Sequence, residues 1–210
     1  MTAPTTTYKR LCLLGPESTG KSRLAETLAA QFGTLVMPEY GRTFDINYMQ
    51  GESGKAKGEN WTEDDLVKLA ATHIAMRDAM MRETGAPQAG ALLVEDTDII
   101  QTAIWAEFLL GAPAPALEKK IRAADLADHY LVLSPEVEWI DDGVRYAGDD
   151  QVRRWFFDDA VARLGKLDLN FDIVDGPHWA ARTAAAIEVA EKIFGRPGLA
   201  IAQPSLQGKR

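Results

Sequence analysis

Short apolar runs alternate with longer segments of helical periodicity along most of this chain. The apolar runs predict β-strands at residues 10–14, 34–37, 91–95, 129–133 and 171–174. Apolar residues that recur every three to four positions predict α-helices over about 21–32, 63–83, 97–110, 118–127, 149–164 and 179–194. Alternation of this kind is typical of crossover connections between parallel strands. The sequence therefore predicts a three-layer α/β/α fold around a five-stranded parallel sheet.

Helix starts and irregular segments refine this picture. Thr62, followed by Asp65, and Thr97, just before an apolar run, are predicted N-caps. Residues 50–60 are rich in Gly, Lys and Glu, and they predict a mobile loop on the substrate side. Residues 196–210 lose the helical pattern after breaks at Gly and Pro, so we expect a flexible C-terminal tail. We expect residues 1–195 to form a single domain.

Charge and composition narrow the function classes. The 31 acidic residues exceed the 23 basic ones, for a formal charge of −8, and no cluster of Lys or Arg marks a nucleic-acid surface. No apolar stretch reaches the roughly 18–20 residues that span a bilayer, and the first residues lack the apolar core of a signal peptide. We therefore expect a cytoplasmic protein that binds neither nucleic acid nor membrane. The single cysteine, Cys12, lies in an apolar run and is expected to be buried.

The clearest chemical signal lies between the first strand and the first helix. An apolar strand runs into a glycine-bounded loop and then directly into an amphipathic helix, which is the context of a phosphate-binding loop. Gly20 lets the backbone approach a phosphate, Lys21 reaches the β and γ phosphates, and Ser22 can ligate Mg²⁺. The sequence therefore predicts a P-loop NTPase fold that binds ATP and Mg²⁺ through Gly15, Glu17, Ser18, Thr19, Gly20, Lys21 and Ser22.

Other motifs separate the classes of P-loop protein. Neither the Asp-x-x-Gly switch nor the Asn-Lys-x-Asp guanine motif of GTPases occurs in the chain. Motor and unfoldase ATPases usually have longer chains, whereas this chain is short and carries its conspicuous arginines late, around Arg145, Arg153 and Arg154. A kinase for a small molecule fits the chain better.

Two candidate sites follow strands at the edge of the sheet where ligands of α/β proteins bind. After the second strand, Glu39 is a candidate base for a substrate hydroxyl, and Arg42 is a candidate for neutralising the transferred phosphoryl group. After the third strand, Asp96 is the candidate for the Mg²⁺ shell. If Asp96 and Asp98 are extended, they share a face, so Asp98 could hold a sugar hydroxyl or act as the base. Glu95 is an alternative, and Asp98 could instead be an acid at a helix start.

Four separated motifs occur along the chain in a fixed order: GPESTGKS, EYGR, DTDIIQT and WIDDGVRYAG. Together they resemble the ribosylnicotinamide kinase domain of the NadR-type NAD biosynthesis proteins, over residues 11–194. The resemblance implies transfer of the γ-phosphate of ATP to the 5′-hydroxyl of nicotinamide riboside, which gives nicotinamide mononucleotide. Larger members of that family also carry an adenylyltransferase domain and sometimes a DNA-binding module, and neither is expected here.

The resemblance also assigns roles to individual residues. It places the phosphate loop on Lys21 and Ser22, the acid and arginine after the second strand on Glu39 and Arg42, and the acids after the third strand on Asp96 and Asp98. It places a lid on residues 139–148, with Asp141, Asp142 and Arg145 as its polar residues. The catalytic set expected from both lines of reasoning is Lys21, Glu39, Arg42, Asp98 and Arg145.

Breaks in the sequence also indicate a helical lid, over residues 134–150. Ser134 and Pro135 break the chain, and Gly143 and Gly148 offer hinges. Arg145, together with Arg153 and Arg154, could then close on the ATP phosphates. The alternative is an ordinary acidic loop followed by a solvated helix start.

The remaining candidates concern the two ends of the expected site. Residues 175–179 resemble the loop that frames adenine in related kinases, which adds Gly176 and Pro177 to the nucleotide site, and His178 is expected to start a helix. An aromatic residue could stack on a cationic pyridinium, with Phe44, Tyr48, Trp61 and Trp105 as candidates. No His or Cys pair has metal-ligand spacing, so zinc is not expected, and His73 and His129 receive no role.

The expected reaction is in-line phosphoryl transfer to nicotinamide riboside or a similar nucleoside. One alternative is a P-loop kinase for another nucleoside or small metabolite. A second is a nucleotide-gated binding protein that senses NAD or ATP. A homo-oligomer is compatible with the sequence.

Overall fold

The fold is described by a computed structural model over residues 9–45, 61–83, 92–140 and 148–195. The five strands are β1 (Lys9–Leu14), β2 (Leu35–Met37), β3 (Leu92–Asp96), β4 (His129–Leu133) and β5 (Phe171–Val174). The helices described are α1 (Lys21–Phe32), α2 (Tyr40–Phe44), α3 (Glu63–Glu83), α4 (Ile99–Leu110), α5 (Pro115–Ala123), α6 (Asp150–Lys166) and α7 (Trp179–Phe194).

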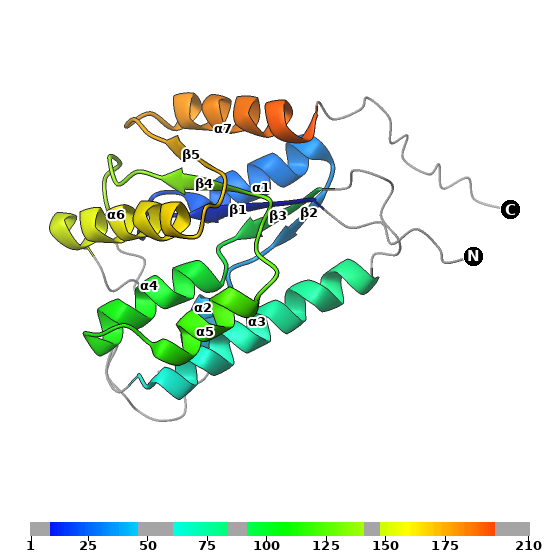
Figure 1. The fold of residues 1–210 in the computed structure, drawn as a ribbon. Coiled ribbons are helices and arrows are strands. Elements are labelled where there is room, and N and C mark those ends of the chain that lie inside the picture. Colours follow the sequence, from blue (N-terminus) through cyan, green and yellow to red (C-terminus); the bar gives the residue numbers. More distant parts are fainter. Residues whose placement is uncertain (1–8, 46–60, 84–91, 141–147, 196–210) are drawn as a thin grey trace, which may run out of the picture.

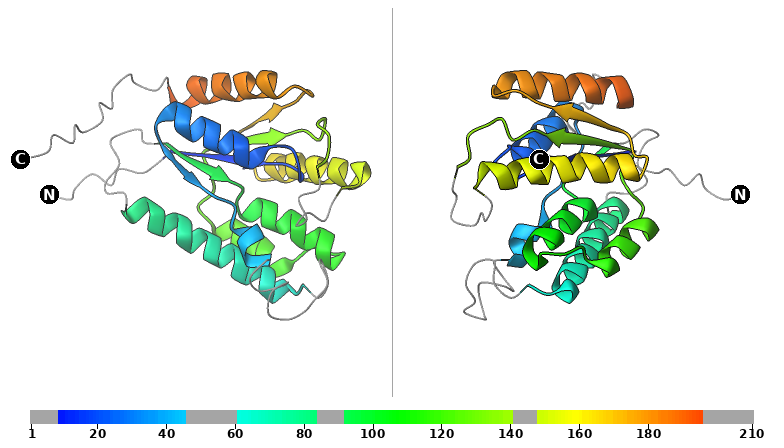
Figure 2. Two further views of the ribbon diagram at one scale, coloured as in Figure 1. Left: turned by 180° about the vertical axis from the view of Figure 1, so that it is seen from behind. Right: turned by 60° about the vertical axis from the view of Figure 1, so that its left-hand side comes forward.

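All five strands lie in one parallel sheet, in the order β2-β3-β1-β4-β5. Helices α1 and α7 cover one face of this sheet, and α4 and α6 cover the other (Figure 1). Helices α3 and α5 pack on α4, further from the sheet (Figure 2). The predicted three-layer α/β arrangement with a five-stranded parallel sheet is confirmed.

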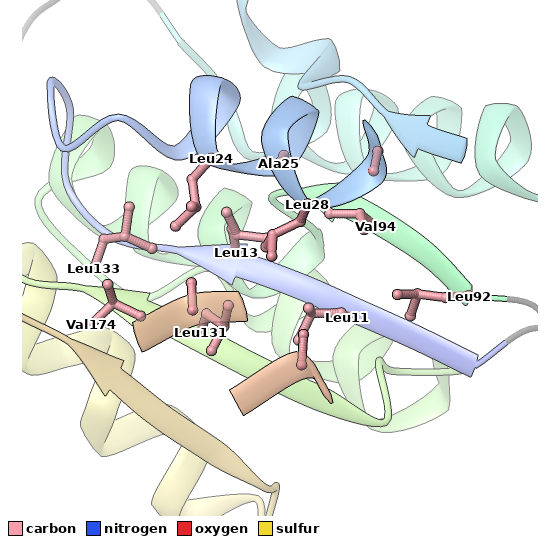
Figure 3. Packing of buried hydrophobic residues seen from close by; sticks show 13 residues of the cluster. Leu11, Leu13, Leu24, Ala25, Leu28, Leu92, Val94, Leu131, Leu133 and Val174 are labelled. Carbon is pink, nitrogen blue, oxygen red and sulfur yellow. The ribbon is translucent and has the colours of Figure 1, made fainter. Parts of the chain in front are cut away.

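Alternation along β1 explains how one strand serves two cores. Leu11 and Leu13 point toward α1 and α7, where Leu24 and Leu28 of α1 pack against them (Figure 3). Their neighbours in sequence point the opposite way, so Cys12 is fully buried against α4 and α6, as predicted. Because both faces are covered, β1 is apolar at every position from Leu11 to its end.

The starts of the helices test the N-caps that were predicted from the sequence. Thr62, a predicted N-cap, forms a capping box with Asp65 at the start of α3: the Asp65 amide donates to Thr62 Oγ1 at 3.2 Å, and the Thr62 amide donates to Asp65 Oδ2 at 3.1 Å. The N-cap predicted at Thr97 is wrong, because Thr97 has a φ of 71° and Asp98 caps α4 instead. Helix α2 was not predicted, because its five residues are too few to show a period.

Several expectations from the sequence lie outside the described residues. They are the loop over residues 50–60, the C-terminal tail over 196–210 and the central part of the lid, including Arg145. The single domain over residues 1–195 remains a prediction. Within the described ranges, none of the helices combines the length and the apolar character needed to cross a bilayer. The cytoplasmic location also remains a prediction.

Candidate active site at the carboxyl ends of the strands

The loop after β1 turns around two positions that require glycine. Gly15 has a φ of 141°, and a Cβ there would lie 2.6 Å from the carbonyl oxygen of Leu133. Gly20 has a φ of 86°, and a Cβ there would lie 2.8 Å from the ring of Trp179. Gly20 is also the N-cap of α1 and has no side chain to cover the first amides of that helix. The turn therefore leaves the N-terminus of α1 open to an anion.

Lys21 lies on the inside of this loop. Its Nζ donates to the carbonyl oxygens of Gly15 and Pro16, at 2.8 and 2.9 Å. Thr19 Oγ1 donates to the same Pro16 oxygen at 2.9 Å. The loop thus holds an ammonium group beside the positive end of the α1 dipole, which is the arrangement that binds phosphates in P-loop proteins.

The side chain of Gln101 in α4 makes two hydrogen bonds to the backbone of Gly15, at the start of the phosphate loop. The sequence had suggested no role for this residue. Its Oε1 accepts from the Gly15 amide at 3.2 Å, and its Nε2 donates to the Gly15 carbonyl oxygen at 3.1 Å. The side chain is buried, with 2% of its surface exposed. Gln101 lies within the DTDIIQT motif, but its partner is 86 residues away, so only the fold shows the contact.

Arg182 of α7 makes a hydrogen bond to the phosphate loop at Thr19. This residue was also not identified from the sequence. Its guanidinium is fully buried and donates to the carbonyl oxygens of Thr19, Ser134 and Val174. These three residues belong to the phosphate loop and to the ends of β4 and β5. A single buried arginine therefore ties the loop to the adjacent edge of the sheet.

Glu39 follows β2 and is the N-cap of α2, where it lines a cavity next to Lys21 and Arg42. The surrounding protein keeps water away from the carboxyl of Glu39, and this desolvation raises its pKa to about 7. The nearby charge of Asp96 also raises this pKa. Lys21 and Arg42 act in the opposite direction. Glu39, Arg42, Asp96 and Lys21 therefore lie close enough to interact. A carboxyl with a pKa near 7 is well suited to accept a proton at neutral pH.

Asp96 and Ser22 meet at the end of β3. The Ser22 hydroxyl donates a hydrogen bond to the Asp96 carboxylate, and burial raises the pKa of Asp96. Asp96 Oδ1 is buried and has no hydrogen-bond partner among the described residues. Within the described ranges no group of three His, Cys, Asp or Glu residues could hold a metal by itself. Two oxygens from the protein fit Mg²⁺, which usually keeps several waters and takes phosphate oxygens.

Asp98 does not lie with Asp96, so the prediction that their side chains share a face is wrong. Thr97 between them has a φ of 71°, which breaks the extended alternation. Asp98 Oδ1 accepts from the Ile100 amide at 2.8 Å, and Oδ2 accepts from the Tyr130 hydroxyl at 2.8 Å. Both oxygens are thus engaged inside the core. Asp98 has the geometry of a helix cap, and we do not retain it as a candidate base.

Glu95, the alternative acid, faces away from the phosphate loop. Its Oε1 lies 2.9 Å from Nε of Arg10, and both side chains are almost completely buried. Burial raises the pKa of Glu95 to about 7, against the opposing effect of Arg10. Glu95 is therefore part of a buried ion pair between β3 and Arg10 of β1, and it does not line the candidate site.

The candidate site is a cavity of about 290 Å³ that begins at the phosphate loop and extends between α2, α3 and α4. The charged residues in its lining include Lys21, Glu39, Arg42 and Asp45. Further from the loop, the lining becomes mostly apolar and aromatic, through Trp61, Leu66, Leu69, Trp105 and Leu109. One end is thus suited to phosphoryl chemistry and the other to a flat organic group.

Of the aromatic residues that could stack on a substrate ring, some line this cavity and others do not. Trp61 and Trp105 line it. Phe44 stacks behind Trp61, with ring centroids 5.9 Å apart and planes at 29°. Trp105 packs edge-to-face on Phe156 of α6, at 4.6 Å. Phe44 therefore supports the wall, and Tyr48 lies outside the described residues.

The lid arginines have different environments. Arg145 lies outside the described residues. Arg153 is 2% exposed and donates to the Val137 carbonyl oxygen at 2.7 Å, so the expectation that it closes on phosphates is wrong. Arg154 is exposed and lies over the ring of Phe157. The described start of the lid contacts the phosphate loop, because the Ile140 amide donates to Ser18 Oγ at 2.8 Å.

The loop expected to frame adenine follows β5. The Gly176 amide donates to Glu136 Oε2 at 2.7 Å, which joins this loop to the segment after β4. His178 is the N-cap of α7, as predicted, and the Trp179 ring lies close to Gly20, with the guanidinium of Arg23 over it at 4.2 Å from the centroid. The role of Gly176 and Pro177 in binding adenine remains a proposal.

The two histidines without an expected role also differ. His129 Nε2 lies 2.9 Å from Asp172 on the neighbouring strand β5. His73 of α3 is 4% exposed and lines the cavity. Burial, with a smaller effect from Arg77, lowers its pKa to about 4, so its imidazole is neutral at pH 7. The sequence gave no signal for this position, because His73 occupies an apolar face of α3.

The sequence of this chain is similar to those of known proteins. A family model described as an AAA domain matches residues 10–182. The trifunctional NAD biosynthesis/regulator protein NadR of Salmonella typhimurium is 25% identical over 190 residues, which are 90% of this chain and 44% of that protein. The chain therefore spans less than half of the length of this curated relative.

Two solved structures share the fold. A crystal structure of NadR protein in complex with NR has a TM-score of 0.71 and 25% identity, and the match covers 94% of this chain and 54% of that one. Thymidylate kinase from Ehrlichia chaffeensis has a TM-score of 0.58 and 15% identity, and the match covers 87% of this chain and 98% of that one. The first match confirms the resemblance indicated by the four motifs, and the second is a likeness of fold alone.

Proposed function

The chain belongs to the AAA domain family, and on that premise we propose that it is an ATP-dependent kinase for nicotinamide riboside. The acceptor is the 5′-hydroxyl, and the product is nicotinamide mononucleotide. Similarity to NadR, including a structure of NadR with NR, supports a P-loop kinase of the nucleoside class. The choice of nicotinamide riboside among nucleosides is the part that needs an experiment.

One observation supports the proposal most strongly. Glu39 lines the cavity close to Lys21 and Arg42, and a Cβ on Gly41 would lie 3.7 Å from Glu39 Oε1 and 3.9 Å from Leu69 of the apolar lining. A nucleoside that places its base among the apolar residues would direct its sugar toward Glu39. In this proposal the apolar end of the cavity binds the base of the acceptor, and the phosphate end receives its sugar hydroxyl.

In the proposed mechanism, the acceptor oxygen attacks the γ-phosphorus in line with the leaving oxygen. The new bond joins the 5′-oxygen to phosphorus, the bond from phosphorus to the β–γ bridging oxygen breaks, and ADP leaves. Glu39 takes the proton of the hydroxyl, and Lys21 and Arg42 offset charge on the transferred group. Most of the rate acceleration is then due to positioning and charge neutralisation.

The nucleotide side of the proposal uses the phosphate loop. The open N-terminus of α1 and Lys21 would hold the phosphates, and Gln101 and Arg182 would keep the loop in shape. Ser22 and Asp96 would hold Mg²⁺, which would supply positive charge to offset that of the phosphates. Arg145, Gly176 and Pro177 complete the proposed nucleotide site.

An acceptor panel tests the proposal. The purified protein is incubated with MgATP and, separately, nicotinamide riboside, the common nucleosides and their monophosphates, while product masses and ADP release are followed. We expect nicotinamide mononucleotide as the main product, absent in Lys21→Ala. If another nucleoside or a monophosphate is phosphorylated instead, that compound is the acceptor and nicotinamide riboside is not. Tight ATP binding with no product from any acceptor would favour a sensing protein over an enzyme.

A further inference from the structure

His73 is an unusual residue in the lining of the candidate site. It lies on the face of α3 that also carries Leu66 and Leu69, both of which line the cavity. Its side chain is 4% exposed, and Nε2 is buried without a hydrogen-bond partner among the described residues. Buried polar atoms in native proteins are nearly always paired, so this nitrogen calls for a partner that the described residues do not provide.

A second buried polar atom occurs in the same wall. Nε1 of Trp61 is also buried without a hydrogen-bond partner among the described residues, although the ring packs against Phe44. Trp61 lies just before α3, and His73 lies near the middle of that helix. The two side chains therefore line different parts of the cavity. Two residues of the cavity lining therefore each carry a buried polar atom that has no partner among the described residues.

The charge around His73 limits what it can bind. Arg77, one turn further along α3, is paired with its neighbour: Nε and Nη2 donate to Asp78 Oδ1, and Nη1 donates to the Asp125 carbonyl oxygen. The cations that line the cavity belong to the phosphate loop, α1 and α2, namely Lys21, Arg23 and Arg42. Arg77 is therefore already paired with Asp78, and a carboxylate brought to His73 would be buried beside a neutral imidazole without an unpaired cation from α3, at a cost.

We propose that His73 hydrogen-bonds an uncharged polar substituent on the head group of the acceptor, and that it thereby selects a carboxamide over a carboxylate. This inference rests on the proposed function, because it assumes that the acceptor is a nucleoside whose head group enters the apolar end of the cavity. His73 is a specificity residue in this scheme and takes no part in the transfer step. Its neutral imidazole can donate or accept one hydrogen bond, which suits an amide.

The test measures equilibrium binding, so that it does not depend on turnover. The probes are three ribosides that differ at one position of the pyridine ring: a carboxamide, a carboxylate, and no substituent. The proteins are the wild type, His73→Leu, His73→Gln and Met76→Gln. Met76 lies on the same helix but is 41% exposed, and it serves as the control for a polar change on α3.

We expect the wild type to bind the carboxamide at least about 10-fold more tightly than the other two ribosides. His73→Leu should lose about 10-fold for the carboxamide and less than about 2-fold for the unsubstituted riboside. His73→Gln, which restores a hydrogen-bonding group, should recover most of the loss, and Met76→Gln should match the wild type. This pattern requires a direct contact, because a general loss of packing would affect all three ribosides equally.

Equal losses for all three ribosides in His73→Leu would overturn the inference, as would tighter binding of the carboxylate by the wild type. Failure of all three to bind would overturn it too. The proposed function fails in a different way. If the carboxamide riboside binds with the predicted dependence on His73 but no phosphorylated product forms, the specificity role stands and the kinase assignment falls.

Discussion

Gln101 holds Gly15 at both of its backbone polar groups, with 3.2 Å from the Gly15 amide to Oε1 and 3.1 Å from Nε2 to the Gly15 oxygen. The same Gly15 oxygen accepts from Lys21 at 2.8 Å. When Lys21 turns toward bound phosphates, Gln101 is the partner that remains. The geometry of the phosphate loop thus depends on a residue of α4, on the opposite face of the sheet from α1.

The first prediction concerns this contact. Gln101→Glu replaces the donor Nε2 with an acceptor that faces the Gly15 oxygen, so we expect weaker ATP binding by about 10-fold and a loss of about 1–3 kcal/mol in the free energy of unfolding. Calorimetric titration with ATP and denaturant unfolding check both values. The control is Gln151→Glu, which makes the same change at an exposed position on α6. Unchanged ATP affinity in Gln101→Glu would show that the contact does not shape the loop.

The second prediction concerns Gly20. Gly20→Ala introduces a Cβ 2.8 Å from the Trp179 ring at a φ of 86°, so we expect at least a 10-fold loss of ATP affinity, about 1.4 kcal/mol or more. Trp179→Leu added to Gly20→Ala relieves the contact but not the backbone strain, and it should rescue only part of the loss.

Gly165→Ala is the matched control for that change. Gly165 lies near the end of α6, and a Cβ there would meet nothing within 4 Å. Alanine also has the higher helix propensity, so this variant should be as stable as the wild type or slightly more stable. If Gly20→Ala binds ATP as well as Gly165→Ala does, the close approach at Gly20 has no functional meaning.

The third prediction links Glu39 to pH. Its pKa is about 7 in the folded protein against 4.5 ordinarily, so the folded state holds the proton more tightly than the unfolded state does. The contribution of Glu39 to stability is therefore largest below pH 4.5 and falls as the pH rises toward 7. Glu39→Gln removes a charge that its surroundings disfavour and should stabilise the ligand-free protein at pH 8, on the order of 3 kcal/mol at most.

The same substitution should lower kcat by about 100-fold or more, because the base is lost. Thermal unfolding from pH 5 to 8 and steady-state rates measure the two effects. Glu188→Gln, an exposed change on α7, should alter neither. A Glu39→Gln variant that keeps wild-type kcat would remove Glu39 from the mechanism.

The fourth prediction separates capping from catalysis at Asp98. Asp98→Asn keeps an oxygen for the Ile100 amide but turns an NH2 group toward the Tyr130 hydroxyl, so it should retain kcat within about 3-fold and lose less stability than Asp98→Ala. Asp98→Ala should cost about 1–3 kcal/mol of unfolding free energy, because it removes the helix cap and leaves the buried Tyr130 hydroxyl without its acceptor. A large fall in kcat for Asp98→Asn with unchanged stability would restore the catalytic role that the sequence suggested.

Contiguous signals were enough to predict the sheet, the phosphate loop and the starts of several elements. The bounds of α1, α3 and α7, for example, match the predicted helices. Asp98 was misjudged because the left-handed conformation of Thr97 rotates it away, and no residue type in that motif signals such a conformation. Gln101, Arg182 and His73 could not be found, because their roles depend on contacts between residues far apart in the chain or on burial.

The most direct test of the central claim follows the phosphoryl group itself. The protein is mixed with nicotinamide riboside and ATP labelled in the γ-phosphate, and the product is analysed by mass spectrometry and by phosphorus–proton coupling in NMR. We predict nicotinamide mononucleotide that carries the label on its 5′-oxygen, formed together with an equal amount of ADP. Label that appears only in inorganic phosphate, with the riboside unchanged, would contradict the assignment of this chain as a nicotinamide riboside kinase.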